Sequence, residues 1–74
     1  MQTHFLRQNF IKTVRVEIRF GLPDGSEAVR VAYLPKETLD RMPKTLLSKP
    51  NNAAFTYCRI YTAKTKKLIS EAYK

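Results

Sequence analysis

The 74-residue sequence contains a single cysteine, Cys58, and a single histidine, His4. One cysteine cannot form an intrachain disulfide, and this usage fits a reducing compartment, so we expect a cytoplasmic protein. One histidine falls short of the several ligands that a metal site needs, and we expect neither a metal ion nor another cofactor. The sequence also lacks an apolar run of the length typical of a signal peptide or a membrane span, so we expect neither secretion nor membrane insertion.

Glycine and acidic residues are also scarce. The two glycines, Gly21 and Gly25, form no loop of the kind that binds phosphate. The six acidic residues are scattered and offer no pair at a spacing typical of acid–base catalysis. Cys58 and His4 are the only candidates for a thiol nucleophile and its base, and their positions give no support for such a pair. We therefore expect a protein that is not an enzyme.

Basic residues, by contrast, are abundant. The sequence has 14 Lys and Arg against 6 Asp and Glu, a formal net charge of +8. A positive charge of this size favours polyanionic partners. The chain is long enough for one small domain and buries only about 60% of its unfolded surface. Residues 1–74 are therefore expected to form a single unit.

Residues 13–34 have the alternating pattern of a β-hairpin. The apolar members of the alternation are Val14, Val16, Ile18, Phe20, Val29, Val31 and Tyr33. The segment Leu22-Pro23-Asp24-Gly25 is typical of a tight turn between the two strands. If Leu22 closes against Gly25, the register pairs Ile18 with Val29 and Glu17 with Arg30, so that the apolar residues of both strands share one face.

The segments on either side of this hairpin are less regular. Residues 1–12 match neither the helical nor the strand period, and we expect an N-terminal arm that docks onto the domain through apolar residues such as Phe5 and Phe10. Residues 35–48 have leucines at helical spacing, interrupted by Pro43. This pattern predicts a kinked helix, or two short helical pieces divided at Pro43, that covers the apolar face of the hairpin.

Residues 53–74 are expected to form a second hairpin. In the strand predicted over residues 55–62, either the aromatic face or the face with Cys58 and Ile60 can be buried, and we favour the latter because Arg59 then reaches water. Residues 68–73 fit a strand or a terminal helix; the preceding lysines would oppose a helix dipole, which favours the strand. The element order β-β-α-β-β indicates an α+β domain with an antiparallel sheet of about four strands and one helix on one face.

The outer face of this sheet is the predicted binding surface. Guanidinium groups bind phosphates and tyrosine rings stack on bases, so arginines interleaved with tyrosines suit nucleic acid. The basic turn between the last two strands adds lysines beside them. The candidate residues are Arg15, Arg19, Arg30, Tyr57, Arg59, Tyr61, Lys64, Lys66 and Lys67.

These features predict a small, basic, nucleic-acid-binding protein with an accessory or regulatory role, and they do not distinguish DNA from RNA. No aromatic strand motif of the RNA-recognition kind and no zinc-finger spacing is present. The alternative is a protein-interaction module or small inhibitor that docks on an acidic partner protein through a strand edge or the Arg/Tyr face, with a homodimer as one form.

Overall fold

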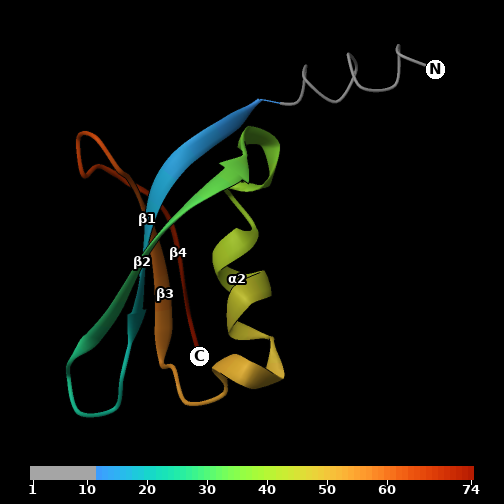
Figure 1. Ribbon diagram of the computed structural model, residues 1–74. Coiled ribbons are helices and arrows are strands. Elements are labelled where there is room, and N and C mark those ends of the chain that lie inside the picture. Colours follow the sequence, from blue (N-terminus) through green and yellow to red (C-terminus); the bar gives the residue numbers. More distant parts are fainter. Residues whose placement is uncertain (1–11) are drawn as a thin grey trace.

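The computed structural model describes residues 12–74, so the predicted N-terminal arm, except for Lys12, lies outside the described residues. Four strands form one antiparallel sheet in the order β2-β1-β3-β4, and short helical segments pack on one side of it (Figure 1). The predicted α+β fold is confirmed. The elements are β1 (Thr13–Gly21), β2 (Glu27–Pro35), the 3-10 turn η1 (Lys36–Thr38), α2 (Met42–Leu47), the 3-10 turn η2 (Pro50–Asn52), β3 (Tyr57–Thr62) and β4 (Leu68–Tyr73).

The turn between β1 and β2 has a different geometry from the predicted one. Gly25 N donates a hydrogen bond to Leu22 O at 2.9 Å, which closes a four-residue turn, but Leu22 N then bonds to Ser26 O, also at 2.9 Å. Gly25 has a φ of 91°. This arrangement, a turn followed by a glycine in the left-handed region, is a common three-residue hairpin loop with a bulge. Leu22 therefore pairs with Ser26 instead of Gly25.

The extra residue shifts the hairpin by one position, so the predicted register is wrong. Ile18 lies opposite Arg30 and not Val29, while Glu17 lies opposite Val31 and not Arg30. Because directly opposite residues share a face, the shift turns every side chain of β2 to the other side of the sheet.

The segment 35–48 forms separate helical pieces and no continuous kinked helix. The turn η1 follows Pro35, and α2 begins at Met42, where Pro43 occupies the first turn. Proline has no N–H to donate and fits the start of a helix, where the first N–H groups lack intrahelical partners. Pro43 thus begins a helix here, which agrees with the predicted division of the segment at this residue.

The core lies between the helical layer and the sheet. Its buried hydrophobic residues are Val16, Ile18, Phe20, Leu39, Leu47, Cys58 and Ile60. Cys58 and Ile60 are fully buried, so the favoured orientation of β3 is confirmed. Phe55, which alternation over residues 55–62 would place on the aromatic face with Tyr57, instead precedes β3 and stacks on Phe20 with ring centroids 4.4 Å apart.

The C-terminal segment forms the strand β4, as favoured from the sequence, and pairs with β3. A shift in register between Ile60 and Tyr61 marks a β-bulge in this pair. The helix α2 packs mainly against β3 and β4 and has few contacts with β2. Among residues 12–74, no helix has the length and apolar character required to cross a membrane.

The turn geometry at Gly25 can be tested at one position. Gly25→Ala should lower the free energy of unfolding by about 1–2 kcal/mol, because a Cβ is unfavourable in the left-handed region. Gly25→Asn should cost less, since asparagine adopts this conformation more readily. Urea denaturation measures both values, and equal losses for the two variants would contradict the positive φ.

Candidate nucleic-acid interface

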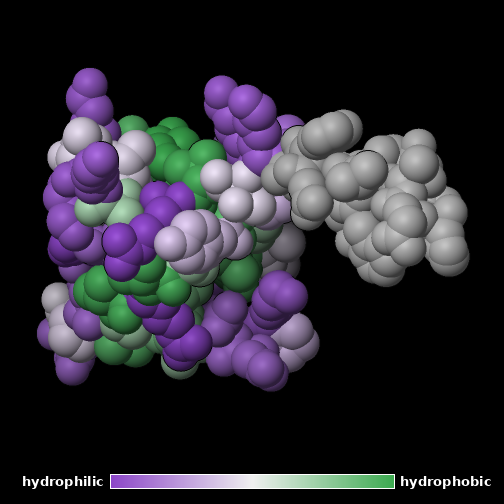
Figure 2. Space-filling model, turned by 45° about the horizontal axis from the view of Figure 1, so that its top comes forward, coloured by the Kyte–Doolittle hydropathy of each residue, from purple (hydrophilic) through white to green (hydrophobic). Residues whose placement is uncertain are grey.

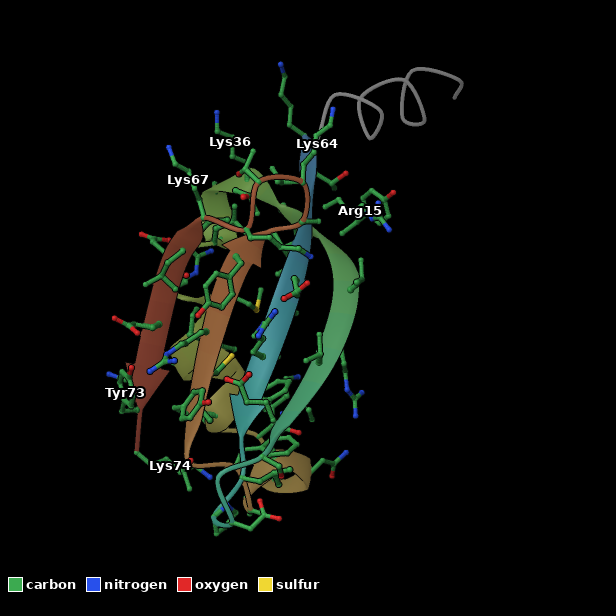
Figure 3. The ribbon with its side chains drawn as sticks, turned by 90° about the vertical axis from the view of Figure 1, so that its left-hand side faces the viewer. Arg15, Lys36, Lys64, Lys67, Tyr73 and Lys74 are labelled. Carbon is green, nitrogen blue, oxygen red and sulfur yellow. The ribbon has the colours of Figure 1, made fainter. Side chains whose placement is uncertain are left out.

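The face of the sheet turned away from α2, here called the outer face, is directed at the viewer in Figure 3. The side chains of β1 and β3 alternate, and Val16, Ile18, Cys58 and Ile60 point into the core. The intervening residues therefore point outward. This brings five of the predicted site residues onto the outer face, namely Arg15, Arg19, Tyr57, Arg59 and Tyr61.

Arg30 does not share this face, and its predicted placement beside Arg15 and Arg19 is wrong. The shifted register sets Arg30 opposite Ile18, whose side chain is in the core. Arg30 remains exposed because the helical layer covers β3 and β4 more than β2. Arg30 therefore lies on the opposite side of the sheet from Arg15 and Arg19.

Glu17 lies at the centre of the outer face and is only 5% exposed. Its carboxylate accepts hydrogen bonds from Lys66 Nζ and Arg19 Nε, each at 2.5 Å. The bond from Lys66, followed by the bond from Arg19, lowers the pKa of Glu17 below its ordinary value of 4.5. Arg19 also contacts Glu27 at 3.3 Å. Two of the predicted phosphate-binding cations are therefore held by carboxylates of the same chain.

Arg59 is enclosed in a second cluster on this face. Its guanidinium carbon lies 4.5 Å from the centroid of the Tyr57 ring and 5.5 Å from that of Tyr73. Arg59 Nη2 donates to the Tyr73 hydroxyl at 2.7 Å, and Arg59 Nε lies 3.3 Å from Glu71 Oε1. The hydrogen bond with Tyr73 is the largest cause of the raised pKa of Arg59.

Tyr57 links the two clusters, because its hydroxyl donates a hydrogen bond to Glu27. This bond is the largest cause of the lowered pKa of Glu27 and of the raised pKa of Tyr57. The Tyr57 ring also lies over Gly21, where a Cβ would overlap with the ring carbon atoms. The absence of a side chain at Gly21 therefore makes room for Tyr57 in this network.

Five of the remaining basic residues are concentrated at one end of the sheet. Antiparallel pairing places the start of β1, the end of β2, and the turn between β3 and β4 at this end. Lys36 N donates to Lys12 O at 3.0 Å, and Ala63 N donates to Arg15 O at 3.3 Å. We call the resulting group the basic end; its members are Lys12, Arg15, Lys36, Lys64 and Lys67.

All five residues of the basic end are exposed. In Figure 3 the side chains of Lys36, Lys64 and Lys67 extend beyond the end of the strands, and Arg15 points to the side. Within residues 12–74, none of the five forms an ion pair. The basic end therefore has positive charges that are not neutralised by the described carboxylates, unlike Arg19, Arg59 and Lys66.

A shallow pocket of about 340 Å³ lies beside the basic end. Its lining comes from β1, from the end of β3 and from the turn that follows, and consists of Val14, Arg15, Thr62, Ala63 and Lys64. When this end of the molecule is turned forward, hydrophilic side chains surround exposed hydrophobic surface (Figure 2). The end of the sheet thus combines charge with a small apolar surface.

The thiol of Cys58 is fully buried, as predicted. Burial raises the pKa of Cys58 to about 11, which keeps it as the neutral thiol near neutral pH. His4 lies outside the described residues. Residues 12–74 contain no group of three or more His, Cys, Asp or Glu that could hold a metal ion.

Three basic or aromatic residues of these clusters are missing from the predicted set, namely Lys12, Lys36 and Tyr73, and so are the carboxylates of Glu17, Glu27 and Glu71. The two lysines were detectable, because Lys12 directly precedes the predicted hairpin of residues 13–34 and Lys36 follows it by two residues, so the hairpin brings them together. Tyr73 was harder to identify from the sequence, since its contact with Arg59 depends on the pairing of β3 with β4. Neither a protein-family model, a curated protein nor a solved structure matches this chain.

The network around Glu17 predicts a specific pH dependence. Because the folded-state pKa of Glu17 lies below 4.5, its stabilising effect is present above pH 4.5 and is lost as pH falls through the folded-state value. Glu17→Gln should therefore destabilise the protein near neutral pH, and the difference from wild type should shrink as the pH is lowered.

Urea denaturation between about pH 7 and about pH 3 measures this difference. Glu37→Gln serves as the control, because Glu37 is exposed and forms no ion pair within residues 12–74. A difference for Glu17→Gln that stays constant over this range would contradict the role of its carboxylate.

Proposed function

We propose that this chain is a small nucleic-acid-binding protein that holds the phosphates of a single strand at its basic end. The observation that carries the proposal is the convergence of Lys12, Arg15, Lys36, Lys64 and Lys67 from separate segments, without an ion pair to a described carboxylate. Lysine and arginine bind phosphates and release the counterions condensed on the polymer, which supplies a large part of the binding free energy.

The choice of the basic end over the centre of the outer face follows from charge compensation. Arg19 and Lys66 both contact Glu17, and Arg59 contacts Glu71. A phosphate that binds one of these cations must compete with a carboxylate that already satisfies it. No such competition is present at Arg15, which faces the outer side close to Lys64 at the shallow pocket.

A single strand fits this surface better than a duplex. The major groove of a duplex is commonly read by an α-helix, and α2 has only six residues and lies on the opposite side of the sheet. Tyr33 stands next to the basic end, directly opposite Arg15, with 67% of its surface exposed. An exposed tyrosine ring beside basic residues is suited to stacking on an unpaired base.

We propose an accessory or regulatory role in the cytoplasm, through binding and without catalysis. Two observations support a function without catalysis. The thiol of Cys58 is buried and neutral, and the carboxylates of Glu17, Glu27 and Glu71 form ion pairs. The alternative function, docking on an acidic partner protein, would use the same basic end. Salt dependence distinguishes the two, because a protein surface lacks a condensed counterion layer of comparable density.

The basic end can be tested by replacing Lys36, Lys64 and Lys67 together with Gln. Each phosphate contact on a single strand contributes about 0.7 to the slope of log affinity against log salt, so the slope should become shallower by about 2. The measurement is fluorescence anisotropy of a labelled single-stranded oligonucleotide over a series of salt concentrations.

The matched control replaces Arg41, Lys44 and Lys49 with Gln, which removes the same charge from exposed positions in the helical layer. This variant should retain most of the wild-type slope. Equal effects of the two triple variants would assign binding to net charge alone, and no binding of the folded wild type at low salt would overturn the proposed function.

The stacking role of Tyr33 is tested separately. Tyr33→Leu should weaken binding to a single strand by about tenfold, since stacking of a base on an aromatic ring contributes about 1–3 kcal/mol. Tyr33→Phe should bind like the wild type because it retains the ring. Equal affinities of the Leu and Phe variants, measured by the same anisotropy assay, would show that the ring does not stack.

A further inference from the structure

The strand β2 forms one edge of the sheet and exposes apolar side chains over much of its length. Val29 is 52%, Val31 54% and Tyr33 67% exposed. All three lie on the outer face, opposite the outward residues of β1. We call them the β2 stripe. Proteins commonly protect edge strands with lysines, prolines or bulges, and the central part of β2 has only Arg30 as a charged residue.

The backbone of β2 also has N–H and C=O groups along this edge that bond to no group within residues 12–74. The bonds from Leu22 N to Ser26 O and from Lys36 N to Lys12 O flank the β1–β2 ladder at its two ends. Both bonds involve even-numbered residues on the β2 side. Because antiparallel hydrogen bonding alternates, the even-numbered residues of β2 bond to β1, and the backbone N–H and C=O groups of the odd-numbered residues point to the open edge. Within residues 12–74, no segment pairs with this side of β2.

We propose that the open edge of β2 pairs antiparallel with β2 of a second copy of this chain, about a two-fold axis at Val31. The strand runs from Glu27 to Pro35, so Val31 is its central residue, and pairing over the whole strand places the axis there. In this register Val29 lies opposite Tyr33 of the second copy. The two β2 stripes then form one continuous apolar surface.

The backbone pattern fits the same register. Val31 bonds to Val31 of the second copy, and Val29 bonds to Tyr33, all with groups that point to the open edge. Pro35, which has no N–H, falls at the end of the pair opposite Glu27. Arg30 lies opposite Ala32, whereas an axis at Arg30 would bring two guanidinium groups together, which is unfavourable.

Charge favours a second copy over an unrelated partner. The turn between β1 and β2 contains Asp24 and is followed by Glu27, while the other end of β2 leads to Lys36 of the basic end. The two-fold axis places the acidic turn of each copy beside the basic end of the other. Opposite charges therefore face one another at both ends of the interface, which is expected to assist association.

The other edge strand is less suited to such pairing. The strand β4 has six residues, compared with nine in β2, and its pairing with β3 contains a bulge. Bulges and short length are both features that limit edge-to-edge pairing. Leu68 on β4 is 48% exposed, similar to Val31, and therefore provides a matched control position.

The oligomeric state tests the proposal. Sedimentation velocity of the nuclease-treated full chain should show a dimer, and Val31→Lys should weaken dimerisation by about tenfold or more because two lysines meet at the axis. Leu68→Lys, which adds the same charge on the other edge, should dimerise like the wild type. A monomeric wild type, or equal dimerisation of the two variants, would overturn the proposal.

A disulfide tests the register. At a hydrogen-bonded antiparallel pair the Cα atoms lie about 5.5 Å apart, within the range for a disulfide. Val31→Cys should therefore form a covalent dimer on mild oxidation, seen on a non-reducing gel. Val29→Cys should not, because its two copies would be about 13 Å apart along the strand. Cross-linking that is equal for the two variants, or absent for Val31→Cys, would contradict this register. Cys58 is buried in both variants.

Discussion

The bulge at Gly25 determines which side chains of β2 meet those of β1, and the surfaces of this protein depend on that pairing. Gly25 adopts a φ of 91°, and the hairpin loop contains one residue more than the predicted tight turn. The loop therefore closes between Leu22 and Ser26. The hydrophobic pattern alone favours the opposite register, in which the valines of both strands would share the core face. The local turn overrides this preference and leaves Val29, Val31 and Tyr33 exposed.

The sheet tolerates this register because little of the core depends on β2. The buried residues lie on β1, β3 and the helical segments, and α2 packs mainly against β3 and β4. On the inner side of β2 the partly buried residues are Ala28, Ala32 and Leu34, of which two are small. A register that buried the valines would need a larger helical layer above β2. The length of α2, six residues, does not provide it.

The sequence was sufficient for the element order and the antiparallel sheet, because these depend on patterns within single elements. It was also sufficient for the burial of Cys58, because burying the other face of the strand would have buried Arg59. It was insufficient for the register of the first hairpin, since Pro23, Asp24 and Gly25 fit both a tight turn and a turn with a bulge. The ion pairs of the outer face could not be predicted from the sequence either. Lys66 contacts Glu17 from 49 positions away, a contact that requires β1 and β3 to be neighbours. An arginine-rich face inferred from alternation therefore appeared more available to a ligand than it is.

The two proposed surfaces differ in the forces on which they depend. Binding of phosphates at the basic end rests on counterion release and weakens steeply with salt. Pairing of β2 rests on backbone hydrogen bonds and on cross-strand contacts between the two β2 stripes, and salt screens only the contribution from the facing charged ends. In the proposed dimer the acidic turn of one copy lies beside Lys36 of the other, so a nucleic acid and the acidic turn would compete for the same lysine. Because binding of the nucleic acid depends more steeply on salt than strand pairing does, moderate salt would release the nucleic acid before it separates the two copies.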